Sequence, residues 1–297
     1  MRSLEKDSPC KVNLLLNILG KRPDGFHELE TVFQPVRLCD ELGFERAGQG
    51  IQLTCSEPGL PVDSRNLVHR AAAAFLQTAQ IKDGVRIHLE KKIPMAAGLG
   101  GGSGNAATTL LGLNELFGQP LALEQLHALA ATLGSDVNFF LQPKPALATG
   151  RGEKIQPLDF FPALRGAGLL LIHPGFGIST AWAYQALARF PAALNGQPGR
   201  AEKLITKLQT TDLAAAGQEF YNSLEAPALD KYPVLALYQG FLREHGAAVA
   251  LMSGSGSTTF AIFPDRTTAE SAMEKFKGKF GAQGWTAIVP LDVKQSG

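Results

Sequence analysis

The segment Gly98-Leu99-Gly100-Gly101-Gly102-Ser103-Gly104-Asn105 is the most informative stretch of this chain, and five of its eight residues are glycine. Where β-carbons are missing, successive backbone N–H groups can turn toward one point and approach an anion closely. Residues 85–90 alternate between apolar and polar and predict a strand before the segment, and the alanine- and leucine-rich residues 106–117 predict a helix after it. This order predicts a phosphate-binding loop over residues 94–105, with the positive end of the helix dipole adding to it.

A hinge, a P-loop and a dinucleotide-binding turn each fit the glycine run less well. A flexible hinge rarely lies between strand and helix signals. The P-loop pattern GxxxxGK[ST] does not occur in the sequence. Gly102, Gly104 and Ala107 match a loose dinucleotide-binding fingerprint, but a loop that starts at Pro94 is longer than the tight turn of that fold.

Composition restricts the class of protein. The chain has 297 residues, which favours two domains, and its hydrophobic content of 45% and charged content of 19% are ordinary for a globular protein. A net charge of +1 gives no general attraction to nucleic acid or to an anionic membrane. Three scattered cysteines indicate a reducing compartment. We expect a cytoplasmic protein, because neither a secretory signal nor an apolar run of about 20 residues occurs.

The remaining pattern mixes strands and helices without a regular βαβ alternation, which favours the α+β class. A polar, proline-bearing stretch over residues 150–162 is a plausible boundary between two domains. Apolar runs at residues 247–251 and 259–263 enclose a second glycine–serine segment, residues 252–257. The further predicted strands cover residues 11–20, 31–38, 50–55 and 168–172, and the further predicted helices cover residues 66–79 and 123–133.

The glycine loop resembles that of the GHMP kinase superfamily, which reads Pro-x-x-x-Gly-Leu-Gly followed by small residues. Three further segments resemble the 4-diphosphocytidyl-2-C-methyl-D-erythritol kinase family within it. They are Pro9-Cys10-Lys11-Val12-Asn13-Leu14 with Arg22-Pro23-Asp24-Gly25-Phe26-His27-Glu28-Leu29, then Gly134-Ser135-Asp136-Val137 with Phe139-Phe140, and Met252-Ser253-Gly254-Ser255-Gly256-Ser257. Their order and spacing agree with the family over nearly the whole chain.

The resemblance implies the GHMP kinase two-domain fold. Residues 1–158 would form an ATP-binding domain like the second domain of ribosomal protein S5, and residues 159–297 a ferredoxin-like substrate-binding domain. The implied reaction moves a phosphoryl group from ATP to the 2-hydroxyl of 4-diphosphocytidyl-2-C-methyl-D-erythritol, a step of the non-mevalonate isoprenoid pathway. The predicted ATP-binding residues are Pro94, Met95, Ala96, Ala97, Gly98, Leu99, Gly100, Gly101, Gly102, Ser103, Gly104 and Asn105.

Two residues are predicted to be catalytic. Asp136 is the candidate general base, because phosphoryl transfer needs an acceptor for the hydroxyl proton. From the residues alone, Asp136 could equally cap a helix behind Gly134 and Ser135. The resemblance places Lys11 beside it, where an ammonium keeps the carboxylate ionised and steadies the incoming hydroxyl. The ordinary fate of such a lysine is a hydrated position at a strand edge.

Five residues are predicted to bind the cytidine substrate. Phe26 and Tyr184 match the stacking positions of the family, and flat pyrimidine faces stack well on aromatic rings. His27 would read the edge of the base, and Asn13 and Thr180 would orient the ribose or the diphosphate. The glycine–serine segment around Gly254-Ser255-Gly256 would close over the substrate phosphates, with a tight β-hairpin as the alternative.

No metal-binding pattern occurs, so Mg²⁺ is expected to arrive with ATP. Three positions depart from the family: Gly104 replaces a usual serine, which would remove a hydroxyl near the phosphates, Asn138 replaces a proline and Phe26 replaces a common tyrosine. We expect a monomer or weak homodimer that binds neither nucleic acid nor membrane. The alternatives are another GHMP kinase of the homoserine or mevalonate type, a nucleotide-binding regulator without activity, and a nucleic-acid-binding module.

Overall fold

The computed structural model describes residues 3–282 and 284–291 and is of the α+β class. Two sheets are present in this part of the chain. The strands are β1 (Ser3–Lys21), β2 (His27–Ala47), β3 (Ile51–Cys55), β4 (Gly84–Glu90), β5 (Ala146–Gly150), β6 (Lys154–Pro157), β7 (Gly168–His173), β8 (Tyr221–Asn222), β9 (Val249–Met252), β10 (Thr259–Phe263) and β11 (Trp285–Pro290).

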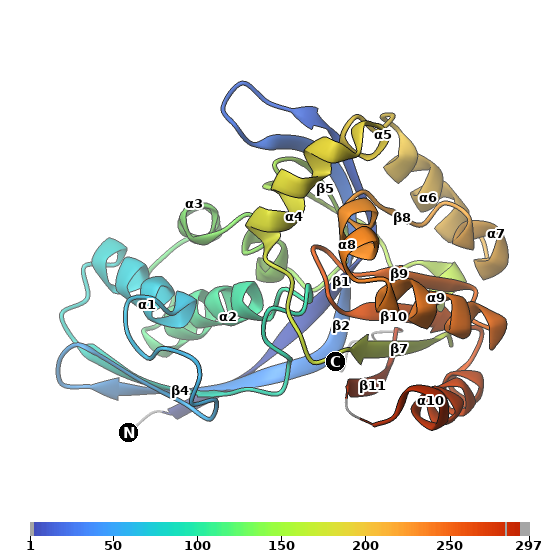
Figure 1. Ribbon diagram of the computed structural model, residues 1–297. Coiled ribbons are helices and arrows are strands. Elements are labelled where there is room, and N and C mark those ends of the chain that lie inside the picture. The colour runs from blue at the N-terminus through green and yellow to red at the C-terminus, as the bar shows by residue number, and fades with distance from the viewer. Residues whose placement is uncertain (1–2, 283, 292–297) are drawn as a thin grey trace. The chain divides into compact units, whose positions relative to one another are not determined.

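Helices alternate irregularly with these strands along the chain (Figure 1). The α-helices are α1 (Leu67–Thr78), α2 (Gly101–Leu116), α3 (Leu123–Leu133), α4 (Thr180–Ala186), α5 (Pro191–Leu194), α6 (Arg200–Leu208), α7 (Leu213–Gly217), α8 (Glu225–Lys231), α9 (Val234–Glu244) and α10 (Arg266–Phe280). Short 3₁₀ helices are η1 (Asn138–Leu141), η2 (Pro162–Leu164) and η3 (Leu187–Arg189).

The chain forms two compact units that do not follow sequence order. The first unit contains the chain up to Cys10, Leu38–Ile93 and Gly100–Pro143. The second unit contains Lys11–Arg37, Pro94–Leu99 and the chain from Lys144 onward. Strands β1 and β2 therefore each contribute to both units, and the glycine segment divides after Leu99.

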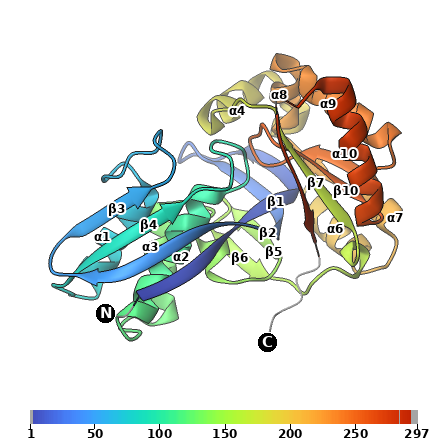
Figure 2. The same cartoon turned by 90° about the horizontal axis from the view of Figure 1, so that it is seen from below.

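In the first unit, helices cover one face of a sheet that runs in the order β3-β4-β2-β1 (Figures 1 and 2). Strand β4 pairs with β2 in antiparallel register and with β3 in parallel register. Helix α2 lies so close to β2 that a β-carbon at Gly112 would lie 2.6 Å from the ring of Phe44. Glycine at this position therefore permits close helix-to-sheet packing.

In the second unit, a four-stranded sheet in the order β11-β7-β10-β9 is covered by α9 and α10 (Figure 2). Strand β7 is buried along its whole length and pairs with β10 and β11 in antiparallel register. Its side chains share a core with aromatic residues of the two helices, such as Phe241 and Phe276. Strand β5 pairs with β2 and strand β8 with β1 in the same unit.

The predicted elements exist, but several boundaries differ. Helix α3 begins and ends where the leucine pattern predicts, and β1 and β2 are longer than predicted, with 19 and 21 residues. The predicted start of α2 at residue 106 is wrong, because the helix begins at Gly101. Gly100 has a left-handed backbone (φ 70°) that turns the chain into the helix, and glycine adopts this conformation without the β-carbon clash.

A buried carboxyl group supports the second unit. Glu225, the first residue of α8, accepts hydrogen bonds through Oε1 from the Met252 N–H at 2.7 Å and from Gln239 Nε2 at 2.6 Å. Burial raises the pKa of Glu225 to about 7, although these two bonds and the charge of Arg243 act in the opposite direction. The folded state therefore retains a proton that the unfolded chain releases near the ordinary glutamate pKa.

This raised pKa predicts that stability falls as the pH rises from about 4.5 through about 7. We expect Glu225→Gln to remove that part of the pH dependence, on the order of 1–2 kcal/mol. Urea unfolding of both proteins at pH 5.5 and pH 8 measures it, with the exposed Glu244→Gln as matched control. An equal pH dependence in the parent and in Glu225→Gln would contradict the assignment.

Candidate active site

The glycine segment presents its anion-binding groups at the start of α2. The N–H groups of Gly101, Gly102 and Ser103 lie in the first helical turn, where no intrahelical acceptor is available. The N–H of Gly104 already donates to the Gly100 carbonyl at 2.9 Å, so the available amides end at Ser103. This turn can hold phosphate oxygens through amides and the helix dipole together.

In the second unit, the loop before this helix touches the hairpin between β9 and β10. A β-carbon at Gly98 would lie 2.1 Å from the Ser253 carbonyl oxygen, so the two backbones meet directly. Ser253 Oγ donates to the Gly98 carbonyl at 2.9 Å, and the Thr258 N–H donates to the Ala97 carbonyl at 3.2 Å. Residues 252–257 lie in a β-hairpin, because Met252 and Thr259 are antiparallel partners, and the role of this segment at the substrate phosphates stays a prediction.

Lys11 is buried in the second unit. The residue is only 3% exposed, so the alternative to its predicted catalytic role, a hydrated lysine at a strand edge, is wrong. Its Nζ donates to Asn13 Oδ1 at 2.6 Å and to the Gly98 carbonyl at 3.1 Å, and it lies 5.4 Å from the centre of the Phe33 ring. The Lys11 backbone is fixed as well, since its N–H donates to the Leu99 carbonyl at 2.9 Å. These contacts hold the ammonium in one place.

Asp136 belongs to the first unit and lies in the turn between α3 and η1. Gly134 is the C-cap of α3 and Val137 is the N-cap of η1, so the aspartate occupies neither cap position. Its side chain is half-buried. The helix-cap interpretation of Asp136 therefore has no support.

The predicted cytidine-binding residues all belong to the second unit. Phe26 is 52% exposed, and the His27 and Tyr184 rings lie 5.0 Å apart. Thr180 Oγ1 is 2.8 Å from Ser255 Oγ, and Asn13 Nδ2 donates to Thr31 Oγ1 at 2.9 Å. The structure thus brings Thr180 to the glycine–serine hairpin and fixes the Asn13 amide between Lys11 and β2.

Burial and the nearby charge of Lys21 lower the pKa of His27. The neutral imidazole is therefore the main form at neutral pH, with one ring nitrogen as donor and the other as acceptor. Such a ring suits recognition of a base edge, which offers both donors and acceptors.

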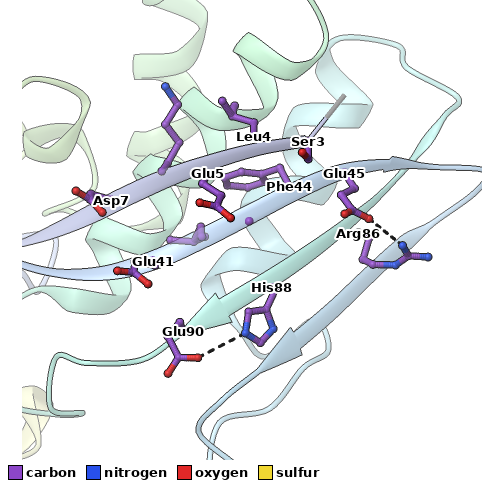
Figure 3. Close-up of a pocket in the computed structure, with 13 residues that line it drawn as sticks. Ser3, Leu4, Glu5, Asp7, Glu41, Phe44, Glu45, Arg86, His88 and Glu90 are labelled. Carbon is purple, nitrogen blue, oxygen red and sulfur yellow. Dashed lines mark hydrogen bonds and ion pairs between the residues drawn. The ribbon is translucent and has the colours of Figure 1, made fainter. Parts of the chain in front are cut away.

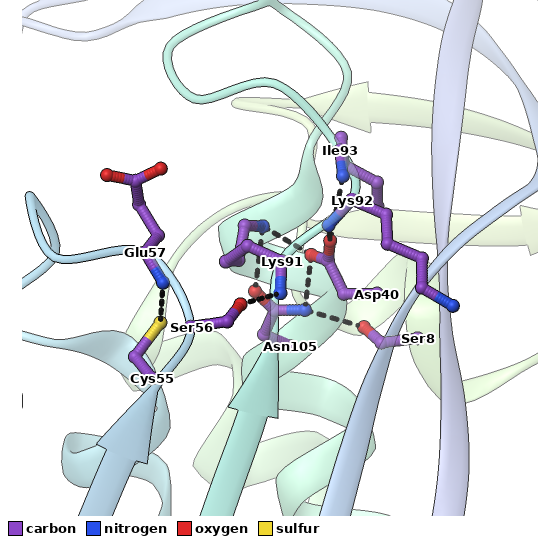
Figure 4. A network of polar contacts seen from close by, with 9 residues as sticks. All are labelled: Ser8, Asp40, Cys55, Ser56, Glu57, Lys91, Lys92, Ile93 and Asn105. Atoms are coloured by element: carbon purple, nitrogen blue, oxygen red, sulfur yellow. Dashed lines mark hydrogen bonds and ion pairs between the residues drawn. The ribbon is translucent and has the colours of Figure 1, made fainter.

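A buried polar network in the first unit was not predicted (Figure 4). The fully buried Asp40 carboxylate accepts hydrogen bonds from the N–H groups of Lys92 at 2.7 Å and Ile93 at 2.9 Å, and forms an ion pair with the Lys91 ammonium. Asn105 Nδ2 donates to Asp40 Oδ2 and to Ser8 Oγ, both at 2.9 Å. The Asn105 amide therefore anchors α2 to β1 and β2.

A side chain at the position of Gly104 would point into the first unit. A β-carbon there would lie 2.5 Å from the Pro9 carbonyl oxygen and 3.3 Å from Ser8 Oγ. The inference that glycine removes a hydroxyl near the phosphates is wrong, because a side chain at this position would face β1.

A cavity of about 710 Å³ lies elsewhere in the first unit, along β1, β2 and β4 (Figure 3). An ion pair joins Arg86 to Glu45 at 2.9 Å there, and His88 Nε2 lies 3.6 Å from Glu90 Oε2. None of the residues predicted for catalysis or substrate binding lines it. In the ranges 3–282 and 284–291, no group of three or more His, Cys, Asp or Glu residues could hold a metal ion, and no helix is long and apolar enough to cross a bilayer.

The backbone contact at Gly98 predicts a strong effect of Gly98→Ala. We expect a loss of several kcal/mol of stability or a displaced loop with lost activity, because the methyl group would overlap the Ser253 carbonyl. The matched control is Gly50→Ala, whose φ of +72° resembles the +75° of Gly98 but whose β-carbon would meet open space. Thermal unfolding measures both variants, and equal losses would show that only backbone strain matters.

Comparison with known proteins identifies the family. The family described as GHMP kinases N terminal domain matches residues 66–142, and GHMP kinases C terminal matches residues 191–282. A Synechococcus protein named 4-diphosphocytidyl-2-C-methyl-D-erythritol kinase is 42% identical over 89% of this chain and 86% of its own length. A Geobacter protein of the same name is 40% identical over 95% of this chain and 98% of its own length.

Solved structures give the same result. A crystal structure of 4-(cytidine 5'-diphospho)-2C-methyl-D-erythritol kinase has a TM-score of 0.77 and 35% identity, covering 97% of this chain and 99% of its own. Homoserine kinase from Cytophaga hutchinsonii has the same TM-score of 0.77 at 20% identity, covering 97% and 94%, and shows the fold alone. The chain therefore belongs to the GHMP kinases, within the group whose members are named 4-diphosphocytidyl-2-C-methyl-D-erythritol kinase.

Proposed function

We propose that this kinase transfers the γ-phosphoryl group of ATP to the 2-hydroxyl of 4-diphosphocytidyl-2-C-methyl-D-erythritol, in the non-mevalonate isoprenoid pathway. The observation that carries the proposal is the second unit, where the buried Lys11 ammonium, the exposed Phe26 ring and the His27–Tyr184 ring pair occur together. A cation suits an oxygen that gains charge, and exposed rings suit a flat base. The names of the similar proteins support the same substrate.

In the proposed reaction, the substrate hydroxyl oxygen attacks the γ-phosphorus, and the bond to the oxygen that bridges the β- and γ-phosphates breaks. ADP leaves with that oxygen, and the hydroxyl proton moves to the Asp136 carboxylate. Lys11 stabilises the attacking oxygen, while the amides of Gly101, Gly102 and Ser103 hold the phosphates. Mg²⁺, which we expect to enter with ATP, would neutralise phosphate charge when bound.

We further propose that residues 1–158 mainly hold ATP and that residues 159–297 mainly hold the substrate. Strand β1 and the segment that leads into β2 are an exception to this division. They contribute predicted site residues to the compact unit that contains Tyr184, namely Lys11, Asn13, Phe26 and His27. Substrate recognition then draws on both ends of the sequence.

A substrate panel tests the function. Release of ADP is measured with the cytidine substrate, with homoserine and with mevalonate. We expect turnover only with the first, because homoserine and mevalonate have no base to stack on Phe26. Phosphorylation of homoserine or mevalonate instead would overturn the substrate and leave the family assignment intact, and ADP release with none of the three would favour a nucleotide-binding regulator.

Asp136→Asn tests the general base. An amide cannot take up the proton, so we expect kcat to fall by a factor on the order of 10² or more while the KM for ATP changes little. The matched control is Asp159→Asn, because the Asp159 side chain is 88% exposed and pairs only with Lys144 among the salt bridges described. Normal turnover of Asp136→Asn would remove Asp136 from the mechanism.

A further inference from the structure

A cation covers one face of the exposed aromatic ring in the proposed substrate site. The guanidinium carbon of Arg151 lies 4.6 Å from the centre of the Phe26 ring. Phe26 remains 52% exposed in this position. Both residues belong to the second unit, so the contact is internal to one compact body.

Strand pairing brings Arg151 to this ring. Leu29 of β2 and Gly150 of β5 are antiparallel partners, so the residue after Gly150 lies beside the residues that precede Leu29. The turn that follows is fixed, because Gly150 and Gly152 have positive φ angles of 73° and 99° and the Arg151 N–H donates to Glu153 Oε2 at 2.6 Å. The Arg151 side chain therefore extends from a rigid turn that lies beside Phe26.

The turn that carries Phe26 is fixed independently. The Phe26 N–H donates to Asp24 Oδ1 at 3.1 Å, and Arg22 binds both Asp24 and Glu28. Burial alone would raise the pKa of Asp24, but the Phe26 amide, Arg22 and the charge of Arg151 lower it overall. These contacts fix the backbone of Phe26 and leave the ring to be oriented by what touches its face.

A guanidinium over an aromatic face is attracted by the ring quadrupole and stacks in a parallel plane. The attraction is small at an exposed position. It nevertheless favours one orientation of the Phe26 ring, which would otherwise rotate freely in water. Since Arg151 occupies one face, a nucleobase can stack only on the other. Phenylalanine has no hydroxyl group, so no hydrogen bond of its own side chain can orient the ring.

We propose that Arg151 is a positioning residue for substrate recognition: its guanidinium holds the Phe26 ring so that the opposite face is presented to the pyrimidine. This inference rests on the proposed function. Arg151 acts through Phe26 and takes no part in the transfer of the phosphoryl group.

The first experiment compares steady-state kinetics of the parent, Arg151→Ala and Arg151→Lys. We expect Arg151→Ala to raise the KM for the cytidine substrate roughly two- to fivefold, the range that an exposed cation–π contact corresponds to, with kcat and the KM for ATP unchanged. Arg151→Lys should recover part of the effect, because an ammonium also binds the ring face. Arg189→Ala is the matched control, since Arg189 lies 5.6 Å from the Phe190 ring, a pair to which we assign no function.

The second experiment separates action through the ring from direct contact with the substrate. Arg151→Ala is repeated in a Phe26→Leu background, where we expect no further rise in KM. An equal rise in both backgrounds would overturn the proposal, because Arg151 would then bind the substrate itself. An unchanged KM in Arg151→Ala of the otherwise unaltered chain would overturn it as well, whereas a parent that fails to phosphorylate the cytidine substrate would refute the proposed function.

Discussion

The second unit depends on one carbonyl group, that of Gly98. It accepts hydrogen bonds from the Lys11 ammonium at 3.1 Å and from Ser253 Oγ at 2.9 Å, and the Gly98 α-carbon faces the Ser253 carbonyl without room for a side chain. Three segments far apart in the sequence, the first strand, the glycine loop and the β9–β10 hairpin, therefore meet at one peptide unit. Because the contact is made by backbone, its geometry has little freedom, and so the position of the Lys11 ammonium has little freedom either.

Each unit contains a buried lysine whose surroundings differ. Lys91 forms an ion pair with the fully buried Asp40, whose carboxylate is also satisfied by two backbone amides and by Asn105. The Lys91 ammonium compensates the Asp40 charge inside the unit, and the pair stabilises the junction of β4 with α2. A buried ion pair is tolerated only when its remaining hydrogen-bonding groups are satisfied. Around Lys11, the neutral oxygens of Asn13 and Gly98 accept hydrogen bonds from the ammonium and orient it.

Sequence patterns predicted the elements better than their junctions. The leucine period defined α3, and the alternation of residues 85–90 defined β4, since both depend on neighbours in the sequence. The start of α2 was missed because glycine has a low helix propensity, whereas here the left-handed Gly100 and the anchored Asn105 determine where the helix begins. Asp40 and Arg151 gave no local signal. The partners of Asp40 lie 51 to 65 residues away in the sequence. Arg151 contacts Phe26 across the pairing of β2 with β5, and only the register of the folded strands brings these two residues together.

Two departures from the family pattern, at Gly104 and Phe26, coincide with long-range contacts of this kind. Gly104 replaces a usual serine where the Pro9 carbonyl would lie 2.5 Å from a β-carbon, so in this chain β1 occupies the space that a side chain would need. Phe26 replaces a common tyrosine at the ring that Arg151 covers. At Gly104 the Pro9 carbonyl of β1 fills the volume that a side chain would need. At Phe26 the Arg151 guanidinium, from the turn after β5, lies over one face of the ring. Each departure therefore has to be considered together with the group that contacts it. We expect Phe26→Tyr to change the effect of Arg151→Ala on the KM for the cytidine substrate more than Phe26→Tyr alone changes that KM.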